Sequence, residues 1–440
     1  MKRFFLMLVS ALCLQGCGGG AANNTPVATG AGADTLISGN ASVQSQLDVG
    51  FNSSPWAGEV NVVDLVVDSG PDGPGVNRLY TSVKICQPGS TAVCKTINHV
   101  LVDTGSVGLR LLASAVPVNL QLSAAGNPGD KVLLGCANFL DGSFAWGPLV
   151  LADVKLAGLT ASNTTVQLVG HSDYRHVQGQ CSSGDPIVTA TDLGANGILG
   201  VGLSQQDCGS ACDPQSRRSA RNGRYFSCVD AACTQVTGSA LAVDKQLQQL
   251  VARFPTDNNG LAIQMDGVAY PGVPVARGKM IFGLGTRSNN QFASAQVLAT
   301  TNQGFLNGAL SSTNGVSLGN FSSTFLDTGS NGIYFDFNLP SCVYPYDSGF
   351  YCPLADMAFN VVLSGVRSGQ VGASFTVSNA AQLLSRGNFA LPTLGGSISM
   401  VGGLDLGLPF FFGRTVVLGI DGMSATGVGA GTVTGPFYAL

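Results

Sequence analysis

The feature of the sequence that most constrains the fold is a strand-and-loop motif that occurs twice. Residues 100–106 read Val-Leu-Val-Asp-Thr-Gly-Ser, and residues 324–330 read Thr-Phe-Leu-Asp-Thr-Gly-Ser. In both copies an apolar strand runs into Asp-Thr-Gly-Ser, and glycine and further apolar residues follow. A repeat in matching contexts indicates two similar halves, each with an aspartate at the end of a buried strand.

The two aspartates of this motif, Asp103 and Asp327, are the candidate catalytic residues. A buried carboxylate is costly unless it is hydrogen-bonded, and a glycine in the loop lets backbone N–H groups approach it. If the loops meet about a pseudo-two-fold axis, the carboxylates lie side by side and share one proton. One then acts as general base toward water and the other as general acid. Taken singly, each motif would be an Asp-Gly turn; the matched pair favours catalysis.

The composition favours a mostly β protein. Glycine contributes 60 of 440 residues, charged residues only 10%, and Glu59 is the sole glutamate. This excludes a coiled coil or a long helical bundle, because strong helix formers with charge are scarce. The net charge is −4, and we interpret the one basic cluster after residue 3 as a solvated face: Arg217, Arg218, Arg221 and Arg224. A nucleic-acid partner is therefore not expected.

The pattern of apolar residues predicts where strands and helices lie. Short apolar runs separated by turn residues predict strands at 79–85, 132–134, 149–156 and 164–169. The clearest helix is predicted at 242–254, because apolar residues recur there at helical spacing.

The N-terminus is predicted to direct export. A short basic start precedes apolar residues 4–14, a run too short to span a bilayer as a stable anchor. Leu14-Gln15-Gly16-Cys17 resembles the lipobox of bacterial lipoproteins. The resemblance implies a signal peptide at 1–16, lipid attached to Cys17 and a flexible lipidated tether at 17–56.

The residue after the cysteine bears on the destination. Gly18 follows Cys17, and no Asp stands at this position. In this respect the sequence resembles lipoproteins that are sent to the outer membrane, where they face the periplasm or the cell surface. The alternative is an ordinary secretory signal with a chance cysteine, which also exports the chain.

The cysteine count agrees with export. Without Cys13 and Cys17, ten of the twelve cysteines remain, and an oxidising compartment allows them to pair. Two pairs, Cys86–Cys94 and Cys342–Cys352, are expected from their close spacing around turn residues, and Cys136–Cys181 is a candidate pair across a longer loop. A local cluster leaves three connectivities open, with a zinc site as the rival interpretation: Cys208, Cys212, Cys228 and Cys233.

With the paired motifs in view, the sequence resembles the pepsin-like aspartic protease family of the retropepsin and pepsin clan, with one Asp-Thr-Gly in each lobe. Residues 139–143 and the strand after them resemble the flap hairpin of that family. Residues 197–202 resemble the strand that passes beneath the first catalytic loop, and residues 406–411 followed by 416–421 resemble its counterpart in the second lobe. Residues 280–283 resemble the strand that opens the sheet of the second lobe.

The resemblance implies a mostly β, bilobal fold with a cleft, divided into an N-terminal lobe with the flap and a Cys-rich insertion at 57–237 and a C-terminal lobe at 238–440. Asp103 and Asp327 would hold the attacking water of an aspartic endopeptidase. Support for this pair is implied at Thr104, Gly105, Ser106, Thr328, Gly329 and Ser330, and flap contacts to substrate at Phe139, Asp141, Gly142 and Ser143. The expected partner is a peptide or protein substrate, bound by a monomer without cofactor or metal.

Three departures from the family pattern bear on activity. Phe139 stands at the position of the flap tyrosine, Arg110 at that of its tryptophan partner, and Asp405 where an apolar residue is usual. The alternative function is therefore a catalytically silent, pepsin-like lipoprotein that binds peptides or proteins in the envelope. A serine hydrolase would need His99, His171 or His176 beside an activated serine, and a Gly/Ser-rich adhesin would not explain the paired motifs.

Overall fold

The computed structural model describes residues 58–71, 73, 75–126, 131–182, 184–208, 223–229, 232–236, 241, 243–343 and 349–440. The protein is mostly β, as the composition predicts, and its helices are short. The predicted signal peptide, the tether with Cys17 and most of the arginine cluster lie outside the described residues. Within the described residues, no helix is both long and apolar enough to cross a membrane.

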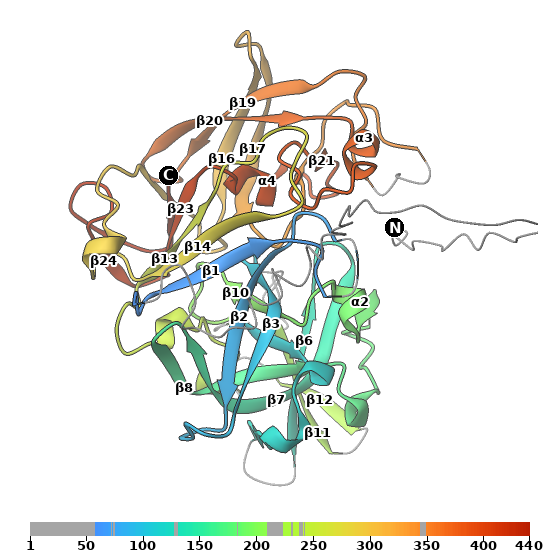
Figure 1. The fold of residues 1–440 in the computed structure, drawn as a ribbon, viewed down its shortest axis with the longest axis vertical. Coiled ribbons are helices and arrows are strands. Elements are labelled where there is room, and N and C mark those ends of the chain that lie inside the picture. The colour runs from blue at the N-terminus through green and yellow to red at the C-terminus, as the bar shows by residue number, and fades with distance from the viewer. Residues whose placement is uncertain are drawn as a thin grey trace, which may run out of the picture.

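Strands from both halves of the sequence build the larger sheet (Figure 1). Strand β1 (Val62–Val67) joins the halves, because it pairs with β14 (Ala276–Phe282) on one side and with β2 (Leu79–Cys86) on the other. The other described strands of this sheet are β3 (Cys94–Asp103), β4 (Val107–Leu112), β5 (Ser123–Ala124), β6 (Val132–Asn138), β7 (Ser143–Leu156), β8 (Leu159–Val169), β9 (Asp185–Ile187), β10 (Gly197–Val201), β11 (Gly223–Val229), β12 (Ala232–Val236), β13 (Gly260–Met265), β15 (Val297–Ala299), β23 (Thr415–Gly419) and β26 (Phe437–Ala439).

The second sheet lies in the upper part of Figure 1 and comes from the second half of the sequence. Its described strands are β16 (Leu306–Ser312), β17 (Ser317–Asp327), β18 (Ile333–Phe335), β19 (Met357–Ser364), β20 (Gln370–Val377), β21 (Gly395–Gly396) and β22 (Gly403–Gly407). Strands β24 (Ser424–Thr426) and β25 (Thr432–Thr434) form a separate hairpin. The short helices are α2 (Ala190–Leu193), α3 (Ala380–Leu384) and α4 (Leu408–Phe411).

One apolar core runs through both sheets and lies directly behind the two motifs. Val102 and Leu326, the residues that precede the two aspartates, are both fully buried in this core. Phe335 on β18 anchors its upper part, with edge-to-face contacts to Phe359 and Phe375. The buried strands thus fix the positions from which the two polar loops emerge.

The four strands predicted from the sequence are present, within β2, β6, β7 and β8. The predicted helix at 242–254 is wrong: over the described residues 243–254, two single 3-10 turns form, at Val243–Lys245 and Val251–Arg253. Between them the backbone bonds to the segment after β10, where Asp207 N donates to Leu247 O. These tertiary hydrogen bonds replace the bonds within a helix, so local helical spacing does not decide the structure here.

The disulfides follow the predicted pairing. Cys86–Cys94, Cys136–Cys181 and Cys342–Cys352 are formed, and Cys228–Cys233 closes the β11–β12 hairpin. Cys208 is also disulfide-bonded, whereas Cys212 lies outside the described residues. The Cys228–Cys233 bond takes up two of the four thiolates that a zinc site would need, which contradicts the zinc interpretation.

Candidate active site

The two motif aspartates occupy equivalent places in the two sheets. Asp103 ends β3 beside Gly200 of the parallel strand β10, and Asp327 ends β17 beside Gly407 of the parallel strand β22. A Cβ on Gly200 would lie 2.6 Å from the backbone nitrogen of Val107, so a side chain there would displace the first loop. Both loops therefore lie directly on a glycine of the neighbouring strand.

The loops meet face to face. A Cβ on Gly105 would lie 2.6 Å from Asp327 Oδ2, and a Cβ on Gly329 would lie 2.6 Å from Asp103 Oδ1. Each aspartate thus packs on the glycine of the opposite motif, where only a hydrogen leaves room. The structure brings Asp103 and Asp327 together, as the repeat predicts.

The motif threonines link the two loops reciprocally. Thr104 Oγ1 donates to Leu326 O at 2.8 Å and accepts from Thr328 N at 2.9 Å. Thr328 Oγ1 donates to Val102 O at 2.7 Å and accepts from Thr104 N at 3.1 Å. Both threonines are buried, so these four bonds are shielded from water and hold the two sheets in one register at the site.

We predict that Thr104→Val lowers the free energy of unfolding by about 2–4 kcal/mol, because each buried group left without a partner costs about 1–3 kcal/mol. The groups that lose their partner are Leu326 O and Thr328 N. Urea denaturation measures this loss, and Thr104→Ser, which keeps the hydroxyl, is the matched control. Equal destabilisation by the two variants would contradict a role for the hydroxyl.

Both carboxyl groups are buried, and each has the same pattern of hydrogen bonds within its own loop. Asp103 Oδ1 accepts from Gly105 N and Asp327 Oδ1 accepts from Gly329 N, both at 2.8 Å. Ser106 Oγ donates to Asp103 Oδ2, and Ser330 Oγ lies 3.2 Å from Asp327 Oδ2. Burial first, and then the neighbouring charge of Asp103, raise the pKa of Asp327 to about 8. The pair therefore retains a proton at neutral pH.

The predicted flap residues form the tip of the hairpin between β6 and β7. Asp141 Oδ1 accepts from the backbone and hydroxyl of Ser143, and Gly142 N donates to Phe139 O. The charge of Asp141 also contributes to the raised pKa of Tyr334 on β18. Phe139 is half-buried against the apolar cluster of the first sheet that includes Ile198.

The hairpin is held along both edges below its tip. Strand β6 pairs with β11 over residues 132–137, and the start of β7 pairs with β9. The Cys136–Cys181 disulfide adds a covalent link between β6 and the segment before β9. The turn at 139–142 lies outside the strand ladders, and its Gly142 O accepts from Asp185 N at 3.0 Å.

Sequence reasoning missed the partners of Arg110. This side chain is 1% exposed on β4 and its Nη2 lies 3.2 Å from Asp207 Oδ2. Tyr225 on β11 donates to Asp207 Oδ1 at 2.5 Å and accepts from Leu247 N at 2.8 Å. Burial raises the pKa of Asp207 to about 6 despite the opposing effect of Arg110. A lone arginine within the apolar strand Val107–Leu112 was the available signal.

The third departure, Asp405, lies at the site. It is 2% exposed on β22, and its Oδ2 lies 2.6 Å from Ser330 Oγ. Ser330 thereby contacts a second carboxyl group in addition to Asp327. The sequence marked this position only as a departure from the family pattern, without indicating that it reaches the motif.

Two of the three histidines make structural contacts. His99 Nε2 lies 3.1 Å from Asp68 Oδ2 in the first sheet, and His171 caps a 3-10 turn, whereas His176 is exposed. The pattern Gly-x-Ser-x-Gly, which sequence reasoning overlooked, occurs at residues 315–319. Its serine, Ser317, is exposed at the start of β17 after a hairpin turn, not at a strand-to-helix elbow. This placement gives no support to a serine hydrolase.

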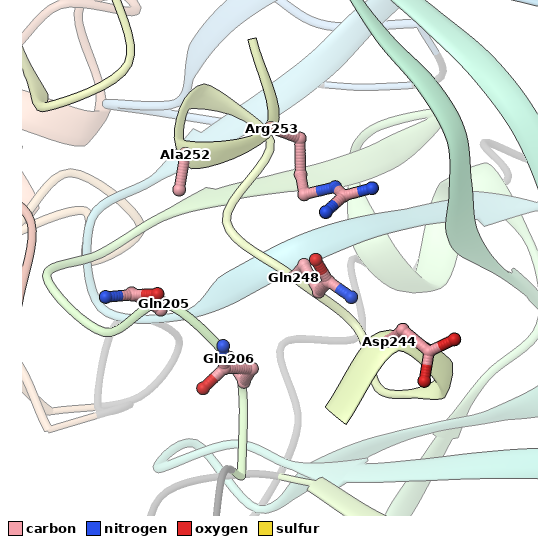
Figure 2. Close-up of a pocket in the computed structure, with 6 residues that line it drawn as sticks. All are labelled: Gln205, Gln206, Asp244, Gln248, Ala252 and Arg253. Atoms are coloured by element: carbon pink, nitrogen blue, oxygen red, sulfur yellow. The ribbon is translucent and has the colours of Figure 1, made fainter. Parts of the chain in front are cut away.

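Figure 2 shows a pocket of about 420 Å³ with a mostly polar lining. None of its lining residues belongs to the repeated motif: Gln205, Gln206, Asp244, Gln248, Ala252 and Arg253. Throughout the described residues, no three His, Cys, Asp or Glu side chains come together in a way that could hold a metal ion.

Fold and site together define a mostly β protein in which two Asp-Thr-Gly-Ser loops converge on one buried pair of carboxyl groups. The chain belongs to the family described as protein of unknown function, DUF3443, which matches residues 57–440. No curated protein matches the sequence.

Proposed function

We propose that this protein is an exported aspartic endopeptidase with a bilobal, pepsin-like fold, which hydrolyses peptide bonds with a water molecule activated by Asp103 and Asp327. The observation that carries the proposal is the reciprocal packing of the two loops, in which each aspartate lies against the glycine of the other motif. A structural turn would not require a second copy in contact with it, whereas a shared-proton pair does.

The geometry supports a balanced reaction. One carboxylate takes a proton from water as the water oxygen attacks the peptide carbonyl carbon, and the protonated partner gives its proton to the carbonyl oxygen. The resulting diol collapses when the first residue passes its proton to the amide nitrogen and the C–N bond breaks. A diol hydroxyl returns its proton to the second residue. Both carboxyls then regain their initial states without a cofactor.

The substrate in this proposal is an extended peptide that lies between the two sheets and pairs with the hairpin tip at Phe139, Asp141, Gly142 and Ser143. The body, divided at residues 57–237 and 238–440, acts as a monomer. A lipid on Cys17 and the tether at 17–56 attach it to the outer membrane after removal of residues 1–16.

A second function has its own support. Phe139 packs into the apolar cluster of the first sheet and carries no hydroxyl, and the hairpin beneath it is paired on both edges. These features favour a silent pepsin-like module that binds peptides or proteins in the cell envelope without cleaving them. The intact aspartate pair with its raised pKa favours the enzyme.

The test is to incubate the purified body, without its signal peptide and lipid, with a mixed peptide library between pH 3 and 8. We expect cleavage that a statine-type mimic of the tetrahedral intermediate blocks. Asp103→Asn and Asp327→Asn should each abolish this cleavage. Their matched control is Asp257→Asn, which makes the same change at a buried carboxyl group that contacts Thr286 and Arg287. Absence of cleavage by folded protein at every pH would contradict the enzyme and favour the binding module.

A further inference from the structure

Ser330 Oγ contacts two carboxyl groups, which is the asymmetric feature of the site. It lies 3.2 Å from Asp327 Oδ2 and 2.6 Å from Asp405 Oδ2. In the first loop, the matching hydroxyl of Ser106 donates to Asp103 Oδ2. The strand position that matches Asp405 there is Ile198, which is apolar, since Ile198 pairs with Leu101 as Asp405 pairs with Phe325.

Counting protons decides the state of this bridge. A serine hydroxyl carries a single hydrogen, so it can donate to only one of two carboxyl groups. An O–H···O⁻ bond to an ionised carboxylate is typically 2.5–2.7 Å long. The 2.6 Å contact to Asp405 is therefore the strong bond of the two, and the 3.2 Å contact to Asp327 is weak. The hydrogen of Ser330 is directed mainly to Asp405.

We propose, on the basis of the aspartic protease function above, that Asp405 is a positioning residue that holds the shared proton of the pair on Asp327. Because the hydrogen of Ser330 is directed to Asp405, the outer oxygen of Asp327 keeps only the long contact to that hydroxyl, which favours the protonated form of Asp327. Asp103, whose outer oxygen keeps the donor Ser106, is then the carboxylate that activates water, and Asp327 is the acid that protonates the carbonyl oxygen.

The charges around Asp405 agree with this arrangement. Tyr334 faces it from β18, and burial together with the charge of Asp405 raises the pKa of that phenol, which stays neutral. Asp327 faces it through Ser330 at the end of β17. Arg78 and Asp141 act on Tyr334 with opposite signs. The hydrogen bond from Ser330 lowers the pKa of Asp327, and Asp405 competes for the hydrogen of that bond.

The experiment follows two pH profiles between pH 4 and 9: the rate of peptide cleavage and the Tm of unfolding. In the folded wild type Asp327 keeps its proton to about pH 8, whereas the unfolded chain loses it near 4. The stability that this proton provides is complete below about pH 4 and is lost as pH rises toward 8. The difference between the Tm profiles of wild type and Asp327→Asn isolates this group.

Asp405→Ile, which copies the matching residue Ile198, is expected to move the alkaline limit of both profiles downward by about one pH unit or more, because the Ser330 donor and one negative charge change together. Asp405→Asn, nearly equal in shape, should shift both limits in the same direction and serves if the isoleucine variant does not fold. Asp257→Asn should lower Tm without moving either limit. In a Ser330→Ala background, Asp405→Ile should shift the limits by less than it does with Ser330 present, because only the loss of its charge then acts.

The outcomes separate this inference from the proposed function. Unchanged limits in both Asp405 variants would overturn the positioning role, even if the wild type cleaves peptides. A shift of the Tm profile without cleavage in any sample would support the positioning role while contradicting the protease. Independent shifts from Asp405→Ile and Ser330→Ala that add in the double variant would also overturn it, since the proposed effect passes through Ser330.

Discussion

Asp327→Asn is expected to lower kcat for peptide hydrolysis by about 10³-fold or more, and Asp103→Asn by a similar factor, because each removes one partner of the general acid–base pair. The amide cannot cycle a proton between water, the carbonyl oxygen and the leaving nitrogen. Both groups lie within the buried contact of the two loops, so water cannot readily take over either role.

The fold should survive these changes. Asparagine has the shape of a neutral carboxyl group, and Asp327 is the group that burial keeps protonated. At pH 8 the unfolded wild type gains stability by ionising Asp327, whereas the buried group in the folded protein resists ionisation. Asparagine does not titrate, so the Tm of Asp327→Asn at pH 8 should equal or exceed that of the wild type. Circular dichroism and thermal unfolding check the fold alongside the kinetic measurement.

The pH profile adds a second expectation to the same experiment. Cleavage by the wild type should continue through neutral pH and fall as Asp327 loses its proton near pH 8. A folded Asp103→Asn or Asp327→Asn protein that cleaves the same peptides at wild-type rate would remove the aspartate pair from the mechanism. Asp257→Asn should retain the wild-type rate, because the side chain of Asp257 contacts Thr286 and Arg287 and no residue of the motifs.

The sequence could predict the pair because its information is local and duplicated. Each strand–Asp-Thr-Gly-Ser segment specifies its own buried strand, turn and polar contacts, and the glycines at 105 and 329 are explained once the loops meet. The same holds for the hairpin disulfide Cys86–Cys94, where spacing alone limits the geometry. The local apolar pattern gives a wrong prediction at 242–254. There the glutamines are buried, and the backbone bonds to the segment after β10 and not within a helix.

The sequence could not predict which polar residues contact Arg110 and Ser330. Arg110 meets Asp207 across 97 residues, and Ser330 meets Asp405 across 75. A charge in an apolar strand signals that some partner exists, because an isolated buried charge is too costly. Which residue supplies the partner depends on strand order and on the β11 insertion, and neither follows from one sequence.

Arg110→Ala is expected to lower the free energy of unfolding by about 3–5 kcal/mol, because removing one partner of a buried ion pair leaves the other charge without compensation. The side chains of Arg110 and Asp207 are each 1% exposed, so solvent cannot replace the guanidinium. Tyr225 would remain as the donor to Asp207, and the β11 strand that carries Tyr225 also supports the hairpin through β6.

The pH dependence and a double variant give this prediction its controls. Burial already raises the pKa of Asp207 to about 6 with Arg110 present, and loss of Arg110 raises it further. Below that range both proteins carry a neutral Asp207, so the destabilisation measured by urea unfolding should be smaller at pH 5 than at pH 8. Arg110→Met with Asp207→Leu removes both charges and should recover most of the loss. If Arg110→Ala changes the free energy of unfolding at pH 8 by less than about 1 kcal/mol, the prediction is contradicted. A loss that small is typical of a solvent-exposed ion pair and not of a buried one.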